Sequence, residues 1–218
     1  TADPDFETKS SYSFTVTATD AAGASAATTV TFSITNVNDV APTITSGATG
    51  TTLVENTNAG QTVYAITADA NDGGTISSYS IGGTDVGFLT LTGNVVSLTA
   101  DPDFETKSSY SFTVTATDAA GASAATTVTF SITNVNDVAP TITSVATGTT
   151  LVENTNAGQT VYTITASTDG GGAITGYEIG GTDAALLTLT GNVVKLTADP
   201  DFENKHDYSF TVTATDAA

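Results

Sequence analysis

The sequence predicts an all-β protein made of tandem seven-strand Greek-key β-sandwiches in an extended array. Thr makes up roughly a fifth of the residues, and Thr and Val favour pleated strands over helices. Apolar residues alternate with polar ones at a period of two, and no stretch carries a long helical period. The chain also repeats itself, which predicts several copies of one folded unit.

The repeat is 98 residues long and nearly perfect. The segment Thr-Ala-Asp-Pro-Asp-Phe-Glu begins at Thr1, Thr99 and Thr197, and residues 1–46 are identical to residues 99–144. A division before Ala41 gives the C-terminal part of one repeat, a complete repeat, and a repeat lacking its last strand. These three domains span residues 1–40, 41–138 and 139–218.

We therefore expect the chain to be a window from a longer protein. Residues 1–40 carry only two strands, so we expect them to need strands from an upstream segment or another molecule to complete their fold. The joint at residues 134–140 has no Gly and ends at Pro140, which fixes its own φ and biases its neighbour towards extended backbone. The joint is accordingly predicted to be stiff once its charges are neutralised.

Within the complete repeat, alternation predicts the strands one after another. Seven short strands in about 100 residues indicate an immunoglobulin-like sandwich. The clearest strand places Tyr110, Phe112, Val114 and Ala116 on one face. The predicted strands cover residues 63–68, 76–81, a hairpin at 89–98, 110–116 and 128–132, and residues 141–143 open the next repeat.

Composition excludes several classes of function. The net charge is −19, from 23 acidic residues against four Lys, which disfavours nucleic-acid binding. No run approaches the roughly 20 apolar residues that span a bilayer, so no direct membrane insertion is expected. There is no Cys, and His206 is the single His. A catalytic carboxylate pair could be placed at Asp103 and Glu105, but the same pair recurs at 5/7 and 201/203, so we predict no enzyme.

The carboxylates gather at predicted strand ends. In residues 41–138 there are nine acidic residues and only Lys107 against them. Asp101, Asp103 and Glu105 follow at spacings of two, so an extended segment would point them to one side. Oxygen ligands without His or Cys select Ca²⁺ over transition metals, and Mg²⁺ prefers fewer carboxylates. An EF-hand starting at Asp69 is disfavoured because its twelfth residue is Ser80.

At these residues the chain resembles an extracellular cadherin repeat, in the bacterial cadherin-like form found in large surface adhesins and biofilm-associated proteins. The resemblance covers the whole chain and five motifs in the right order. They are the Leu-Val-Glu-Asn segment at 53–56, Asp-x-Asn at 69–71, Asp-x-Glu at 103–105, Ala-x-Asp at 116–118, and the linker at 134–140.

The resemblance implies up to three Ca²⁺ ions in each joint between repeats, with ligands carried over motif by motif. For the first joint these are Asp5, Glu7, Asn36, Asn38, Asp39, Val40, Asp69, Asn71 and Asp118. For the second joint they are Glu55, Asp103, Glu105, Asn134, Val135, Asn136, Asp137, Val138, Asp169 and Asp216. Six of these ligands in the second joint are carboxylates, which matches the charge of three divalent ions.

The sequence departs from the cadherin pattern at three places. The first linker Asp is Asn36 or Asn134, and the Asp-x-Asp motif is Asp-x-Asn at 69–71 and Ser-x-Asp at 167–169. Each departure removes an anionic ligand, which predicts one weak ion in each joint and different affinities in the two joints.

The resemblance implies a calcium-rigidified, rod-like spacer of a large extracellular protein on a bacterial cell surface, acting in adhesion, biofilm or surface fibres. Neighbouring repeats of the same chain are the expected partners. Two alternatives stay open at this point. One is a carbohydrate-binding module for a surface polysaccharide, with variable loops around 167–178 and 184–186. The other is homotypic association of exposed strands into a fibre or sheath.

Overall fold

The structure is a computed structural model, and it describes residues 3–24, 26–168 and 170–217. The described residues form β-strands and two short 3₁₀ helices, which confirms the predicted all-β fold. They divide into two compact units, Thr1–Pro102 with Lys107–Ile132, and Asp103–Thr106 with Thr133–Ala218. None of the described helices has the length and apolar character needed to cross a bilayer. The repeat boundaries given above stay a prediction.

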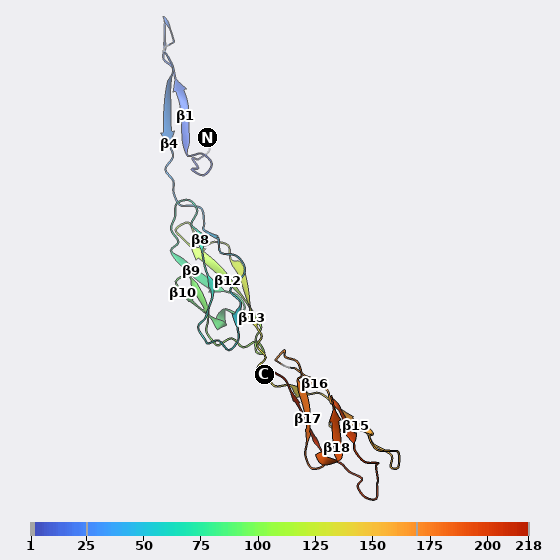
Figure 1. Ribbon diagram of the computed structural model, residues 1–218. Coiled ribbons are helices and arrows are strands. Elements are labelled where there is room, and N and C mark those ends of the chain that lie inside the picture. The colour runs from blue at the N-terminus through green and yellow to red at the C-terminus, as the bar shows by residue number, and fades with distance from the viewer. Residues whose placement is uncertain (1–2, 25, 169, 218) are drawn as a thin grey trace. The chain divides into compact units, whose positions relative to one another are not determined.

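The described residues between Ser11 and Ser33 form a hairpin. Strands β1 (Ser11–Val16) and β4 (Thr28–Ser33) pair antiparallel (Figure 1), and the short strands β2 (Thr19–Asp20) and β3 (Gly23–Ala24) pair near its tip. Tyr12 lies opposite Phe32, and their rings stack with centroids 5.2 Å apart. Phe14 and Phe32 remain 51% and 50% exposed. Two strands alone therefore leave one apolar face uncovered.

The complete repeat is a sandwich of two sheets. One sheet has the order β6-β13-β12-β9, and the other has the order β10-β11-β7, with β5 and β8 pairing separately. The strands are β5 (Thr43–Ile44), β6 (Leu53–Val54), β7 (Thr62–Ala65), β8 (Ala68–Asp69), β9 (Ser78–Gly82), β10 (Leu89–Thr92), β11 (Val95–Leu98), β12 (Ser109–Thr117) and β13 (Thr126–Thr133), with a 3₁₀ helix η1 (Val86–Phe88).

The core of this sandwich lies where the alternation predicts it. Phe112 and Val114 on β12 pack with Val128 on β13 and Val96 on β11, and all four are at most 1% exposed. The predicted single strand at 63–68 is wrong, because it breaks into β7 and β8. At the break, the Ile66 amide donates to the Asn94 carbonyl, and the Asn94 side chain donates back to the Ile66 carbonyl, at 2.8 and 3.0 Å.

The following repeat has the same order of elements up to its last described strand, except that residues 151–152, the counterpart of β6, form no strand. Its sheets are β14 (Thr141–Ile142) with β16 (Ala166–Ser167), β15 (Thr160–Thr163) with β19 (Val193–Leu196) and β18 (Leu187–Thr190), and β17 (Gly176–Gly180) with β20 (Thr211–Thr215). A 3₁₀ helix, η2 (Ala184–Leu186), precedes β18. Ile164, Leu187, Val194 and Leu196 form its buried core.

Candidate metal centres

The first linker, residues 34–40, is held against the loop that follows β8. The Asn36 side chain donates to the Asp72 carbonyl at 2.9 Å, and the Asp39 amide donates to the Asp72 carboxylate at 3.0 Å. The Asn38 side chain donates to a carboxylate oxygen of Asp118 at 3.1 Å. Strand ends that are far apart in sequence thus meet at one point, and each contributes oxygen atoms.

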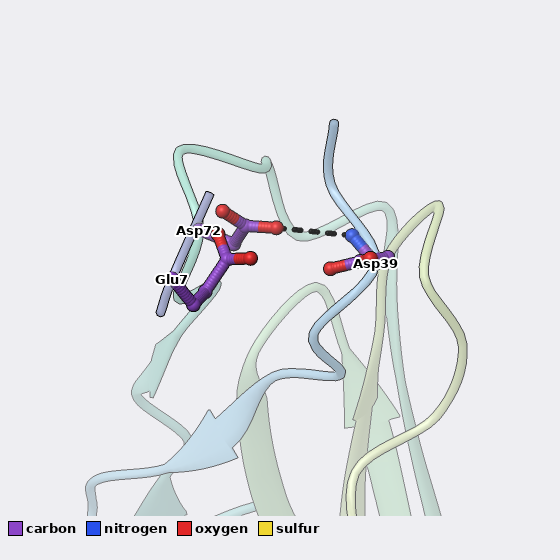
Figure 2. Close-up of side chains that lie close together, drawn as sticks. All are labelled: Glu7, Asp39 and Asp72. Carbon is purple, nitrogen blue, oxygen red and sulfur yellow. Dashed lines mark hydrogen bonds between the residues drawn. The ribbon is translucent and has the colours of Figure 1, made fainter. Parts of the chain in front are cut away.

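Three carboxylates converge at this point. Oxygens of Glu7, Asp39 and Asp72 all lie within 4.8 Å of one another. Figure 2 shows Glu7 and Asp72 side by side, with Asp39 facing them from the linker and joined to Asp72 through its backbone amide. Like charges at this separation repel, so the arrangement favours a bound cation.

The electrostatics of the cluster reflect this crowding. The Asp72 carboxylate beside Glu7 raises the pKa of the Glu7 side chain. The pKa of Asp72 is lowered, first by its hydrogen bond with Glu7 and then by the amide of Asp39.

Buried side-chain atoms without a hydrogen-bond partner lie at both linkers, and their oxygens are suited to bind a cation. Among the described residues, the Oδ1 atoms of Asn38, Asp72 and Asn134 are buried without a hydrogen-bond partner, and so are both amide atoms of Asn136. Buried polar groups are rarely left unpaired, and each unpaired group needs an explanation such as an ion. Amide and carboxylate oxygens are the ligands that Ca²⁺ takes. The residues present therefore fit the predicted ion.

Several predicted ligands of the first joint shape its loops. Asp5 accepts bonds from the amide and hydroxyl of Thr8 at 3.0 and 2.9 Å, which lower the pKa of Asp5. The Asp69 carboxylate accepts from the Asn71 amide at 2.8 Å. Asn71 has a φ of 51°, in the left-handed region, and its side chain donates to the Ala41 carbonyl at 2.7 Å. Val40 lies in the linker and is 38% exposed.

Asp118 is the most buried predicted ligand of this joint, at 7% exposure. One of its oxygens accepts from the amides of Ala120 and Gly121 at 2.9 and 3.2 Å, and the other accepts from Asn38. These bonds fix the orientation of the Asp118 carboxylate at the joint.

Asp72 is the residue that motif reasoning missed. The cadherin motifs give Asp72 no role, yet its carboxylate joins the cluster. The Asp69 carboxylate instead accepts from the Asn71 amide, and the Asn71 side chain donates to the Ala41 carbonyl. A sequence signal was present. Asp72 directly follows Asn71, the position where the cadherin pattern has a second Asp, so the missing carboxylate reappears one residue later.

The second linker is packed tightly against glycines after β16. A Cβ atom at Gly172 would lie 2.3 Å from the Asn136 side-chain nitrogen, and one at Gly170 would lie 2.9 Å from its oxygen. A Cβ at Gly171 would lie 3.3 Å from the Asn134 side chain. A Cβ atom at any of these three positions would force the linker or its side chains to shift.

Predicted ligands of the second joint fall in both compact units. In the second unit, carboxylate oxygens of Glu105 and Asp137 lie within 4.8 Å of each other. Asp103 accepts from the amide and hydroxyl of Thr106, both at 2.8 Å, which lower the pKa of Asp103. In the first unit, Glu55 is buried, with 2% exposure.

The remaining predicted ligands of the second joint lie in loops or outside the described residues. Val135 is 41% exposed, and Val138 is half-buried. The Asp216 carbonyl accepts from the Thr175 hydroxyl at 3.1 Å. Asp169 lies outside the described residues.

A third carboxylate cluster lies in the last repeat. Oxygens of Glu153, Asp201 and Glu203 are within 4.8 Å of one another, and Glu153 accepts from the Phe202 amide at 3.1 Å. The ligand assignment above omitted this cluster. The signal was the 98-residue spacing, which maps these residues onto Glu55, Asp103 and Glu105.

Comparisons with known proteins support the cadherin resemblance. No family model matches the chain. The chain is 33% identical over 187 residues to mouse protocadherin Fat 4 and 29% identical over 224 residues to human protocadherin gamma-B4. The matches cover 83% and 97% of this chain, and the chain spans only 4% and 24% of those relatives.

The fold agrees with the sequence matches. A crystal structure of mouse cadherin-23 EC22-24 superposes with a TM-score of 0.70 at 24% identity, covering 99% of this chain and 72% of that chain. The all-β tandem architecture is therefore that of cadherin domains. Homology to cadherin domains supports a place in the cadherin superfamily.

Proposed function

We propose that this chain, through its cadherin-domain homology, is a calcium-rigidified segment of a long extracellular adhesion protein. The proposal rests on one observation. Carboxylates converge at the linker, and the linker also holds buried amide oxygens that have no hydrogen-bond partner among the described residues. At the first joint these are Glu7, Asp39 and Asp72 beside Asn38. A divalent cation would satisfy the oxygens and neutralise the charge in one step.

The ion would act by joining the linker to the loops around it. Glu7 precedes the linker, Asp39 lies within it, and Asp72 and Asp118 follow it in the next repeat. Ligands contributed from both sides would remove freedom from the joint, so binding would convert a flexible connection into a stiff one. We propose up to three ions in each joint, as the predicted ligand sets imply.

The cellular setting is a further part of the proposal. An array whose stiffness depends on calcium suits an environment where that ion is abundant, which favours the outside of a cell. We propose a bacterial surface protein with roles in adhesion or biofilm, in which these repeats act as a spacer. This part rests on the resemblance of the sequence to bacterial cadherin-like repeats.

Calorimetric titration of the 218-residue chain with calcium tests the proposal. We expect saturable binding of several ions and weaker binding by an Asp39→Asn variant, because Asp39 belongs to the carboxylate cluster. A Glu178→Gln variant is the matched control, since Glu178 is an exposed residue on β17 outside the clusters. Absence of binding, or an equal effect of the two substitutions, would contradict the proposal.

A further inference from the structure

An ion pair with a buried carboxylate lies in the complete repeat, outside the carboxylate clusters. The Lys107 ammonium is 3.1 Å from one oxygen of Asp85, and the other oxygen accepts from the Ser111 amide at 2.7 Å. The Asp85 side chain is only 9% exposed. The ammonium also lies over the rings of Phe88 and Tyr110, at 5.9 and 5.2 Å from the ring centroids. A carboxylate and two ring faces thus hold the ammonium in one place.

The last repeat shows which part of this arrangement is constant. There the Lys205 ammonium lies 3.1 Å from Asp183, whose carboxylate accepts from the Ser209 amide at 2.7 Å. Leu186 takes the position of Phe88, so one of the two rings is lost, yet the ion pair has the same length. The carboxylate, rather than the rings, therefore sets the position of the ammonium.

The paired lysine follows the Asp-x-Glu motif closely in the sequence. Lys107 comes four residues after Asp103 and two after Glu105, both of which are predicted ligands of the second joint. It is also the only Lys or Arg among residues 41–138, which carry nine acidic residues. An ammonium at this position is a natural counter-ion for the two ligand carboxylates, because opposite charges on neighbouring side chains attract.

The backbone of the last repeat brings the corresponding residues within reach of each other. The Lys205 amide donates to the Asp201 carbonyl at 3.0 Å, which closes a single helical turn. Side chains four residues apart on such a turn are neighbours, so an ammonium at 205 can reach a carboxylate at 201. Asp201 belongs to the carboxylate cluster with Glu153 and Glu203. The ion pair that Lys205 forms is nevertheless with Asp183, on the loop before η2.

We propose that Asp85 is a positioning residue for calcium at the second joint. It binds the Lys107 ammonium and thereby leaves the carboxylates of Asp103 and Glu105 free for the ion. A released ammonium would pair with these ligands, and the apparent calcium affinity would fall in proportion to the fraction of molecules whose ligands are free. This inference rests on the proposed calcium function and adds a residue that none of the predicted ligand sets contains.

Three variants of the 218-residue chain separate this role from simple stabilisation of the fold. Asp85→Asn keeps an oxygen for the Ser111 amide but loses the charge that holds Lys107. We expect it to weaken calcium binding at the second joint about fivefold, near the upper limit for an exposed ion pair. Lys107→Met removes the competing cation and should not weaken calcium binding. The double variant should bind calcium as the original chain does.

Backbone amide signals in NMR report the two joints separately. A calcium titration of each isotope-labelled variant gives a half-saturation concentration at Thr106, whose amide donates to Asp103, and at Thr8, whose amide donates to Asp5 in the first joint. Thr8 is the internal control, because the substitutions lie outside the ligand set of the first joint. Glu178→Gln is the matched control variant, since it removes one negative charge without releasing a lysine. Thermal melts in chelator check that each variant folds.

Three results would overturn this role of Asp85 and leave the proposed calcium function intact. Equal weakening by Asp85→Asn and Lys107→Met would mean that the pair only anchors the turn. An unchanged half-saturation at Thr106 in Asp85→Asn would mean that the pair acts on stability alone. A double variant that binds as weakly as Asp85→Asn would mean that the released lysine does not compete. Absence of saturable calcium binding by the original chain would instead overturn both the proposed function and this inference.

Discussion

At the residue scale, the position of Asp72 sets the charge of the first joint. Its carboxylate lies with those of Glu7 and Asp39, and one of its oxygens is buried without a hydrogen-bond partner among the described residues. We expect Asp72→Asn to keep the size of the side chain but weaken calcium binding by about tenfold, or about 1.4 kcal/mol. Calorimetry on the variant measures this change, with Glu178→Gln as the control.

A substitution at the neighbouring residue, Asn71→Asp, should not strengthen calcium binding. Its side chain donates to the Ala41 carbonyl and the Thr43 hydroxyl, at 2.7 and 3.1 Å, and a carboxylate cannot donate either bond. Asn71→Asp would restore the cadherin pattern, yet Asp72 already supplies the carboxylate. A large gain of affinity in Asn71→Asp would therefore show that Asp72 is not a ligand.

Asp183 gives the fold a measurable pH dependence. It accepts from the Ser209 amide at 2.7 Å and pairs with Lys205 at 3.1 Å, and both contacts lower the pKa of Asp183 from its ordinary value of 3.8. A lowered pKa stabilises the folded state above pH 3.8, and this contribution is lost as the pH falls through the folded-state pKa.

We accordingly expect Asp183→Asn to lower the melting temperature at neutral pH. The difference from the original chain should shrink as the pH falls below 3.8, because the Asp183 carboxylate is then protonated in the unfolded chain before it is protonated in the folded one. Thermal melts across this range measure the difference. A difference that stays constant down to pH 2 would contradict the role given to the charge of Asp183.

At the element scale, the contact between linker and loop limits what the glycines after β16 tolerate. Gly172→Ala would place a Cβ atom 2.3 Å from the Asn136 amide, so that side chain must move. We expect weaker calcium binding and little change of stability in chelator. Gly47→Ala is the control, because a Cβ there meets nothing within 4 Å. Equal calcium affinity of the two variants would contradict a ligand role for Asn136.

Local sequence patterns predicted the strands that depend only on neighbouring residues. The alternation along β12 and β13 identified both strands and their buried faces, since each side chain's face follows from its position alone. The break between β7 and β8 depends on Asn94, 28 residues away, which no local pattern reveals. Likewise, motif positions located the linker, but only folded geometry distinguishes Asp72, which joins the cluster, from Asp69, which caps a turn.

At the scale of the whole molecule, charge dominates behaviour without calcium. The net charge of −19 destabilises the folded state, because its negative charges repel one another. The complete repeat alone carries nine acidic residues against one Lys. Two agents can reduce this repulsion. Dissolved salt screens exposed charges at every place, whereas bound ions neutralise particular clusters and link the segments that hold them.

Thermal melts of the whole chain separate these two effects. In chelator, added sodium chloride should raise the melting temperature gradually, through screening. Calcium should raise it at far lower concentration and add about 2.7 kcal/mol for each site at a hundredfold excess over Kd. Such a gain is worth about 4–8 °C per kcal/mol in a domain of 60–100 residues, which is the size of one repeat.

Magnesium supplies the decisive comparison for these melts. It requires near-ideal octahedral geometry and gives up its waters reluctantly, so crowded carboxylates and amides suit it poorly. At equal concentration it should reproduce only the screening part of the calcium effect. If magnesium raised the melting temperature as far as calcium does, the clusters would respond to divalent charge alone, and the joints would not be selective calcium sites.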